Sequence, residues 1–266
     1  MSGFDHGFTA EELACFRETK ALLIKSKGFD ASTLDPRAIV LTAINCKLRA
    51  DTACEKYSKL SVAMKEFGIE SFHEVWKDVG RDCEYLVGSN IARLMNVYAP
   101  CGTDKQNRSI MWIRAAQQVN VADEADSVKA GVIYWTAIHS DFTSLRSGIT
   151  FVLDTTSNDV EKVGNEAKMQ RVYQSIPLRP QRIYILGAFF LKRLAINALI
   201  ALTSLFTREK VLDRIRFAEI DEVRMEISEE SLPVYVGGGG GEKSTANENV
   251  LWVKSRIKDF PQIPDF

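Results

Sequence analysis

Two cations one helical turn apart, Lys210 and Arg214, are the clearest candidates for chemistry in this chain of 266 residues. They lie i, i+4 on one face of an expected helix, where like charges repel slightly unless an anion or a carboxylate lies between them. A guanidinium offers a planar fork of donors and an ammonium a compact charge, so both suit phosphate groups. The alternative is that they form solvated pairs with Glu209 and Asp213. The spacing therefore predicts either a local anion contact or a cluster of surface ion pairs.

The usual catalytic and metal-binding signatures are missing from the sequence. It contains no G-x-S-x-G elbow, no P-loop and no H-E-x-x-H pair. Its three histidines have no ligand spacing, and its five cysteines include no C-x-x-C pair. We therefore expect no enzyme, no metal and no cofactor. Of the histidines, His139 follows an apolar helix face, where it would either give one hydrogen bond to a ligand hydroxyl or carbonyl or be an ordinary helix-end histidine.

Composition places the chain among compact globular proteins, because 45% of its residues are hydrophobic and 26% are charged. The formal net charge of −1 gives no global field that would attract nucleic acid. The first residues lack the basic and apolar regions of a secretory signal, and the odd number of widely spaced cysteines fits a reducing compartment. These features predict a cytoplasmic protein that binds no nucleic acid.

One segment, from Leu194 to Phe206, is apolar on every side, since its only polar side chains are Asn197, Thr203 and Ser204. Such a helix needs apolar surroundings all round. A wholly buried core position is one solution, and contact with more protein, a bound lipid or a membrane is the other. The uncharged run is shorter than the ~20 residues that a membrane span needs, so we expect it to rest in an interface at most.

The first third of the chain predicts a small helical bundle. A capping box of Thr9 and Glu12 begins a helix that ends at Lys27-Gly28, and a second helix follows the turn at Asp35-Pro36. Two further capping boxes predict two more helices, and they pair Thr52 with Glu55 and Ser71 with Glu74.

Beyond about residue 95, strands alternate with helices, which is typical of a mixed or parallel sheet covered by helices. The expected strands are 95–100, 109–115, 148–154, 182–188 and 215–218, with the turn 102–108 joining the first two as a hairpin. Helices are expected at 123–139 and 160–175. We therefore divide the chain into a helical module at 1–90, an α/β domain at 91–240 and a tail at 241–266 that either binds a partner or folds back over the body.

The order of motifs along the α/β region resembles the CRAL-TRIO lipid-transfer family. Gly148-Ile-Thr-Phe-Val-Leu-Asp154 matches that family's G-x-T-x-x-x-D strand, Ile176-Pro-Leu-Arg179 leads into the next strand, and Leu232-Pro-Val-Tyr-Val-Gly-Gly238 is similar to its closing L-P-x-x-x-G-G. The resemblance implies an α/β fold with a helical amino-terminal module and a mixed, largely parallel five-stranded sheet. It also implies an apolar cavity closed by a gate helix, here residues 191–206.

Within the family, the chain looks closer to the α-tocopherol transfer and retinaldehyde-binding branch than to the yeast phosphatidylinositol transfer protein. That protein has a Pro-Glu-Arg triplet, and in this chain Leu178 stands in place of the glutamate. Departures from the family are a reduced basic segment at 43–49 and Gly187-Ala188-Phe189 in place of an Asn-x-Pro bend. The resemblance assigns phosphoinositide contacts to Arg179, Lys210 and Arg214. It assigns the lining of the cavity to Tyr134, Ile138, Phe151, Leu153, Tyr184, Leu186, Phe190, Leu194, Ala198 and Leu202, each of which ordinary core packing explains equally well. Asp154 is expected to hydrogen-bond a loop.

The function implied is an intracellular carrier of a small hydrophobic ligand such as a tocopherol, retinoid, carotenoid or sterol. Burial of each methylene gains about 0.8 kcal/mol, so few polar contacts are needed to hold such a ligand. We expect a monomer that meets membranes transiently and peripherally through anionic phosphoinositides. Two alternatives stay open, namely a phospholipid transfer protein and a membrane-docking scaffold without cargo.

Overall fold

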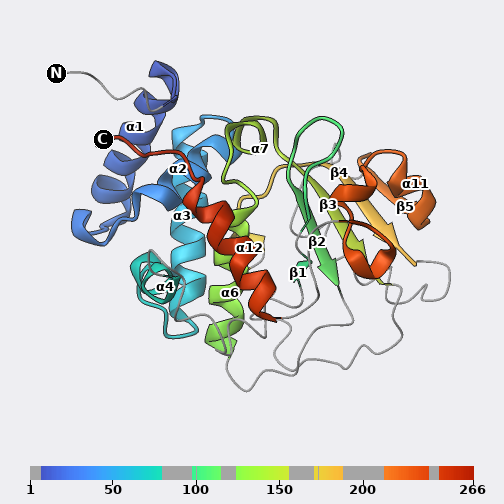
Figure 1. The fold of residues 1–266 in the computed structure, drawn as a ribbon. Coiled ribbons are helices and arrows are strands. Elements are labelled where there is room, and N and C mark those ends of the chain that lie inside the picture. Colours follow the sequence, from blue (N-terminus) through green and yellow to red (C-terminus); the bar gives the residue numbers. More distant parts are fainter. Residues whose placement is uncertain are drawn as a thin grey trace.

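Five strands form one mixed sheet in the order β1-β2-β3-β4-β5, in the part of the chain that the structure describes (Figure 1). This structure is a computed structural model that describes residues 7–79, 98–99, 101–114, 124–155, 171–172, 174–187, 213–239 and 246–266. β1 runs antiparallel to β2, and the remaining pairs are parallel. The strands span Tyr98–Ala99, Ile110–Arg114, Ile149–Asp154, Pro180–Leu186 and Ile215–Ala218. The five predicted strands and the hairpin between the first two are confirmed.

The two faces of the sheet pack into different cores, because successive side chains of a strand point to opposite sides. One face, which we call the helical face, contributes Met111, Phe151, Leu153, Ile183 and Ile185 to the larger core. The other, the outer face, contributes Ile110, Trp112, Val152, Tyr184, Leu186 and Ala218 to a smaller core. Helix α11 (Ile220–Arg224) and short 3₁₀ helices at Glu229–Ser231 and Val234–Val236 follow β5, and side chains from this region complete the smaller core.

The first helices largely follow their local signals. In α1 (Ala10–Lys27) both hydrogen bonds of the Thr9–Glu12 capping box form, and Gly28 ends the helix with φ +71°. In α2 (Pro36–Asn45) the Asp35 carboxylate accepts from the N–H of Ala38, at 2.8 Å. A 3₁₀ turn at Ala31–Thr33 lies between them.

Two of the predicted capping boxes are wrong in detail. α3 (Ala50–Lys65) begins after Arg49, which makes no side-chain cap, so Thr52 lies inside the first turn of the helix. α4 (Phe72–Val79) does follow Ser71, but the Glu74 carboxylate accepts from the N–H of Glu70 at 3.2 Å. A Ser/Thr-x-x-Glu spacing thus also occurs inside a helix, as at Thr52, and at a helix start where the glutamate accepts from a different N–H, as at Ser71.

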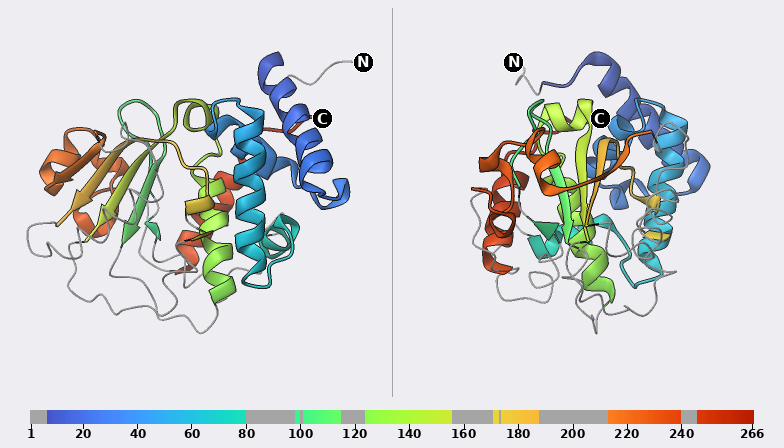
Figure 2. Two further views of the ribbon diagram at one scale, coloured as in Figure 1. Left: turned by 180° about the vertical axis from the view of Figure 1, so that it is seen from behind. Right: turned by 90° about the vertical axis from the view of Figure 1, so that its right-hand side faces the viewer.

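Helices α6 (Glu124–Ala137) and α7 (Phe142–Ser147) lie in the connection between β2 and β3. α6 confirms the helix predicted at 123–139. It runs beside α12 (Ala246–Lys258), and Figure 2 shows both between the sheet and helices α1 to α3. Most of the helix predicted at 160–175 lies outside the described residues, as does the predicted gate at 191–206.

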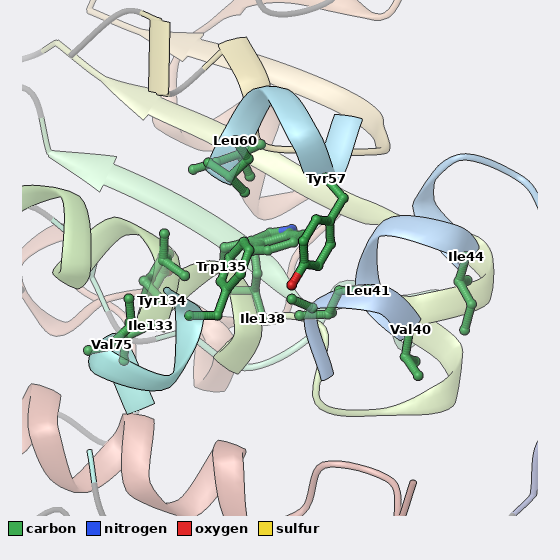
Figure 3. Packing of buried hydrophobic residues seen from close by; sticks show 14 of the residues in the cluster. Val40, Leu41, Ile44, Tyr57, Leu60, Val75, Ile133, Tyr134, Trp135 and Ile138 are labelled. Carbon is green, nitrogen blue, oxygen red and sulfur yellow. The ribbon is translucent and has the colours of Figure 1, made fainter. Parts of the chain in front are cut away.

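A single large core crosses the boundaries drawn from the sequence at residues 90 and 240. It includes Leu41, Tyr57 and Leu60 from the helical module and Ile133 and Trp135 from α6 (Figure 3). It also includes Val253 from α12. The helical module therefore forms part of the cover over the helical face.

The carboxy-terminal segment folds back over the body, which was one of the two predicted alternatives. On α12, the Trp252 indole N–H donates to the carbonyl of Cys101 at 3.2 Å. Farther on, the Phe260 ring lies 5.5 Å from the guanidinium of Arg37, and the Phe266 ring packs 5.4 Å from that of Phe16. This segment ties the sheet, α6 and the helical module together.

None of the described helices is both long and apolar enough to cross a membrane.

Candidate functional site

Two arginines meet at the edge of the sheet where β4 and β5 begin. Arg179 directly precedes β4 and Arg214 directly precedes β5. The register pairs Ile215 with Ile183, so Arg214 approaches Arg179 through its side chain, which reaches back along β4 to Pro180. One guanidinium nitrogen of Arg179 donates to the carbonyl of Arg146 at 2.6 Å, and one of Arg214 donates to the carbonyl of Pro180 at 2.6 Å. We call Arg179 and Arg214 the arginine pair. Since a guanidinium has five N–H donors, each arginine keeps donors beyond its backbone contact.

The electrostatics of the arginine pair favour an anionic partner. Burial, together with the nearby positive charge of Arg214, lowers the pKa of Arg179 from its ordinary value. The Nε of Arg179 is buried without a hydrogen-bond partner among the described residues. In the same part of the chain neither arginine forms a salt bridge, and the neighbouring Asp213 is exposed. The alternative pairing of Arg214 with Asp213 is therefore not seen, while Glu209 and Lys210 lie outside the described residues.

The glycine of the G-x-T-x-x-x-D motif holds Arg179 in place. Gly148 has φ +82°, and a Cβ there would overlap the carbonyl oxygen of Arg179. The same carbonyl accepts from the N–H of Ile149 at 3.1 Å. The close approach of the two backbones, which only glycine permits, joins the start of β3 to the residue before β4.

The described residues predicted to line the cavity do not share one surface. Tyr134, Ile138, Phe151 and Leu153 belong to the larger core on the helical face. Tyr184 and Leu186 belong instead to the smaller core on the outer face. Phe190, Leu194, Ala198 and Leu202 lie outside the described residues. The odd-numbered neighbours Ile183 and Ile185 face the same side as Phe151 and Leu153, and the register of β3 against β4 would have identified them.

Tyr134 has a structural role in the core. Its hydroxyl donates to the carbonyl of Ala99 at 3.2 Å, and its ring stacks on that of Tyr98 with centroids 4.3 Å apart. The ring of Trp252, on α12, also packs against Tyr134, with ring centroids 5.5 Å apart. These contacts fix Tyr134 by packing.

His139 is fully buried just beyond the end of α6. Its Nδ1 lies 2.8 Å from the carbonyl oxygen of Trp135, and its Nε2 has no hydrogen-bond partner among the described residues. Burial lowers the pKa of His139 to about 4, so the ring is neutral at pH 7. His139 therefore makes the hydrogen bond expected of a helix-end histidine through Nδ1, while its Nε2 has no partner among the described residues.

Two motifs that are far apart in sequence meet at the other end of the parallel strands. The Tyr235 hydroxyl of the L-P-x-x-x-G-G segment donates to the carboxylate of Asp154, the last residue of the G-x-T-x-x-x-D strand. The Trp112 indole N–H donates to the same hydroxyl at 2.7 Å. Burial and the nearby Asp154 raise the pKa of Tyr235 well above its ordinary value. The loop contact expected of Asp154 is present.

We expect Tyr235→Phe to lower the free energy of unfolding by about 1–3 kcal/mol, because the buried Trp112 N–H would lose its acceptor. Urea unfolding of Tyr235→Phe, Trp112→Phe and the double variant would give the coupling between the two side chains. Additive losses would contradict the hydrogen-bonded chain.

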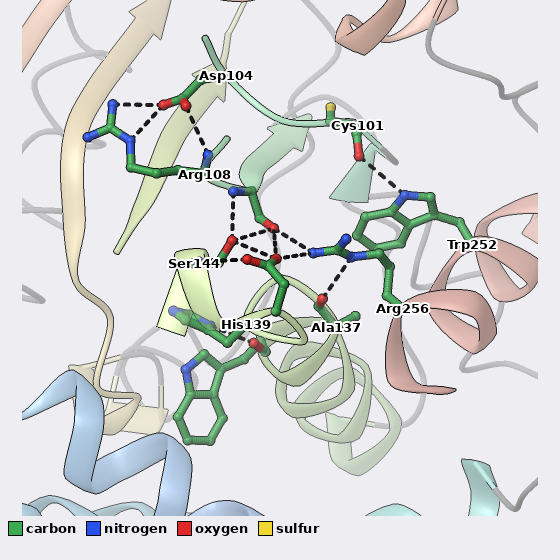
Figure 4. A network of polar contacts seen from close by, with 11 residues as sticks. Cys101, Asp104, Arg108, Ala137, His139, Ser144, Trp252 and Arg256 are labelled. Carbon is green, nitrogen blue, oxygen red and sulfur yellow. Dashed lines mark hydrogen bonds and ion pairs between the residues drawn. The ribbon is translucent and has the colours of Figure 1, made fainter. Parts of the chain in front are cut away.

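Sequence reasoning missed a second polar network beneath α12 (Figure 4). The Arg256 guanidinium donates to the carboxylate of Asp141 at 2.7 Å and to the Ser109 hydroxyl at 2.6 Å, and the Ser144 hydroxyl lies 2.8 Å from the same carboxylate. Asp141 also caps α7 through the N–H of Ser144. This network anchors α12 to the start of β2. Within the described ranges, no cluster of three or more His, Cys, Asp or Glu side chains could hold a metal ion.

Comparison with known proteins adds no family assignment, since no protein-family model matches the chain and no curated protein matches it significantly.

Proposed function

We propose that this protein is a carrier that holds a small hydrophobic molecule against the helical face of its sheet and exchanges it at membranes. It would dock through phosphoinositide phosphates bound at the arginine pair. The observation that carries the proposal is the meeting of Arg179 and Arg214, predicted from the resemblance, at one edge of a sheet without a carboxylate partner among the described residues. Guanidinium groups suit phosphate because their donors match its oxygens in pairs.

The apolar character of the helical face near β5 supports a hydrophobic partner there. Ile215 pairs with Ile183 and Phe217 pairs with Ile185, so both β5 residues face the helical side. The Phe217 side chain is 48% exposed, which is unusual for a phenylalanine in a sheet. An apolar ligand would find apolar contacts on this part of the sheet.

The strand order of the sheet also supports placing the ligand on the helical face. Connections between neighbouring parallel strands are right-handed, so sequential strands in the order β2-β3-β4-β5 place their connections on one side of the sheet. The β2–β3 connection carries α6, which packs on the helical face. We therefore assign the proposed cavity to that face, with Phe151, Leu153, Ile183 and Ile185 as its floor.

We expect the double variant Arg179→Ala/Arg214→Ala to bind vesicles containing phosphatidylinositol bisphosphate on the order of 10-fold more weakly, because each cation near an anionic surface contributes about 1 kcal/mol. Cosedimentation with the vesicles measures this. Retention of cargo should not change, since the arginines lie outside the apolar floor.

The matched control is Arg216→Ala, which removes an exposed cation from β5 on the opposite face. It should bind vesicles almost as the parent does. Equal weakening by the control and the double variant would mean that the membrane senses only total charge. Unchanged binding by the double variant would refute the docking assignment.

Native mass spectrometry of the purified protein separates the carrier from its alternatives. A stoichiometric small apolar compound supports the carrier, and a phospholipid supports phospholipid transfer. A protein that is empty after purification and takes up no lipid from vesicles would instead be a docking scaffold.

A further inference from the structure

Strand β4 carries one extra residue opposite β3, at the edge of the sheet where the arginine pair lies. Ile149 pairs with Pro180, whereas the next residue of β3, Thr150, pairs with Arg182. Gln181 therefore has no opposite residue on β3 and forms a β-bulge. A bulge re-aims the side chain of its strand, and bulges are frequent beside functional sites. The Gln181 side chain is thus the first candidate for a further ligand contact at this edge.

The Gln181 carboxamide lies against the glycine that follows α7. Its Nε2 is 2.8 Å from the position that a Cβ on Gly148 would occupy, and the carbonyl oxygen of Arg179 lies beside the same position. The missing side chain of Gly148 therefore leaves room for the carboxamide. Gln181 is partly exposed, and its side chain forms no hydrogen bond with the part of the chain that the structure describes. Its polar atoms are free to meet a ligand.

Both guanidiniums of the arginine pair reach the same short stretch of backbone. Arg179 donates to the carbonyl of Arg146, near the end of α7. Arg214 donates to the carbonyl of Pro180, which belongs to the peptide bond that leads into the bulge. Burial and the charge of Arg214 both lower the pKa of Arg179, so each guanidinium lies within reach of the other's charge. The contacts gather two cations and one carboxamide where α7 meets the starts of β3 and β4 (Figure 1).

The three side chains have complementary hydrogen-bonding chemistry. A guanidinium can only donate, whereas a carboxamide also accepts through its oxygen. The Gln181 nitrogen is the atom beside Gly148 and the Arg179 carbonyl, so the oxygen is left for a ligand. A phosphate dianion has acceptors but no donor, so it pairs with the arginines and leaves that oxygen unused. A hydroxyl next to the phosphate would donate to it.

The Ser147 hydroxyl is the nearest alternative contact. Ser147 is exposed, directly precedes Gly148 and makes no hydrogen bond to any described residue. A hydroxyl donates as readily as it accepts, so it would serve a bare phosphate as well as a polyol. Ser147 therefore predicts no preference between the two, whereas Gln181 predicts a preference for the polyol.

We propose that Gln181 is a third binding residue of the docking site and that this site recognises the phosphorylated polyol headgroup of a lipid. The arginine pair binds the phosphate, and the Gln181 oxygen accepts from a hydroxyl on a neighbouring carbon of the same headgroup. This inference rests on the proposed docking function, because it specifies the headgroup that the same site takes. Arg179, Gln181 and Arg214 are each partly exposed, so the headgroup reaches them from the surface.

The test compares two soluble polyanions by isothermal titration into the full chain. Inositol trisphosphate carries hydroxyls beside its phosphates, and inorganic tripolyphosphate carries a comparable charge without a polyol. We expect the parent to bind inositol trisphosphate about 5-fold more tightly, the effect of one additional hydrogen bond. Equal dissociation constants would show that the edge senses only phosphate charge, and they would overturn the inference.

Substitutions at Gln181 separate its chemistry from its position. Gln181→Met keeps the length of the side chain but removes the acceptor, so the ratio of the two affinities should fall toward one while tripolyphosphate binding hardly changes. Gln181→Glu places a carboxylate beside the arginine pair, so both compounds should bind several-fold more weakly. The matched controls are Gln262→Met and Gln262→Glu, at an exposed glutamine of the carboxy-terminal segment, and they should behave as the parent does.

Ser147→Ala tests the alternative contact. It should leave the preference for inositol trisphosphate unchanged. If the preference instead disappeared in Ser147→Ala and survived in Gln181→Met, the assignment to Gln181 would be wrong.

Failure of the inference is distinguishable from failure of the docking proposal. A parent that binds phosphatidylinositol bisphosphate vesicles without preferring inositol trisphosphate would keep the docking site and lose the polyol site. A parent that prefers inositol trisphosphate but ignores the vesicles would keep the polyol site and lose docking. Binding of neither soluble compound would defeat the inference outright. These comparisons use the parent protein, so they do not depend on any variant folding.

Discussion

Asp104→Ala should lower the free energy of unfolding by about 3–5 kcal/mol, the cost of breaking a buried ion pair by removing one partner. Asp104 and Arg108 are only 5% and 8% exposed, and the Asp104 carboxylate accepts from the Arg108 Nε at 2.8 Å. The same carboxylate accepts from the Thr150 hydroxyl at 2.7 Å. Removal of the Asp104 carboxylate would leave the buried Arg108 cation without its ion-pair partner. Urea unfolding followed by circular dichroism measures the change.

Asp221→Ala is the matched control for this prediction. Asp221 pairs with Arg224 at 2.9 Å, but its side chain is 83% exposed, so the loss should stay below about 1 kcal/mol. Thr150→Val would test the neighbouring hydroxyl separately, with an expected loss of about 1 kcal/mol. Similar losses for Asp104→Ala and Asp221→Ala would contradict the role given to burial.

The Asp104 carboxyl also makes a contribution to stability that depends on pH. Burial alone would raise its pKa, but hydrogen bonds from Thr150 and Arg108 outweigh burial and lower it. A carboxyl whose pKa is lower in the folded state stabilises the fold above its unfolded value and loses that effect as the pH falls. The difference in stability between parent and Asp104→Ala should therefore shrink on acidification below about pH 4.

Gly148→Ala has the second large expected effect, and it links the fold to the proposed docking site. With φ +82° and ψ −167°, Gly148 occupies a region that is essentially restricted to glycine. The added Cβ would also overlap the Arg179 carbonyl. We expect a loss of about 3 kcal/mol or more in unfolding free energy, together with weaker binding to phosphoinositide vesicles, because relief of the clash would displace Arg179.

Gly28→Ala provides the comparison for Gly148→Ala. Gly28 also has a positive φ, but nothing lies within 4 Å of the position that its Cβ would occupy. Its substitution should cost only about 1 kcal/mol and leave vesicle binding unchanged. If both substitutions behaved alike, the close approach to Arg179 would not be what makes Gly148 necessary.

The strands could be predicted because each is a short apolar run between turn residues, and the fold class follows from their alternation with helices. The start of α1 could also be predicted, since Thr9 and Glu12 form both bonds of their capping box. The start of α3 could not, because the same spacing at Thr52 and Glu55 falls inside the helix. Local signals locate an element more reliably than its first residue.

The candidate site was only partly predictable, for a physical reason. The parity of a residue within a strand decides the face on which it lies, and parity depends on the register between neighbouring strands. Tyr184 and Leu186 were therefore assigned to the cavity together with Phe151, although the pairing of β3 with β4 puts them on the outer face. Ile183 and Ile185 were omitted for the same reason.

Polar networks between distant segments leave even less trace in the sequence. Asp141, Ser109 and Arg256 meet because α12 returns to α6, and no spacing along the chain encodes that return. The unpaired Nε2 of His139 is a further example, because it depends on how the folded chain surrounds the ring and no local spacing predicts it.

The late position of α12 in the chain has a consequence for biosynthesis. Helix α6 leaves the ribosome more than a hundred residues before α12 does. On α12, Val253 packs in the same core as α6, and Arg256 binds Asp141. Until then the nascent chain exposes apolar surface and keeps an uncompensated carboxylate beside Ser109. A ribosome that stalls just before α12 should therefore hold a chain that chaperones recognise, whereas one that stalls after the segment has emerged should hold a chain already resistant to protease.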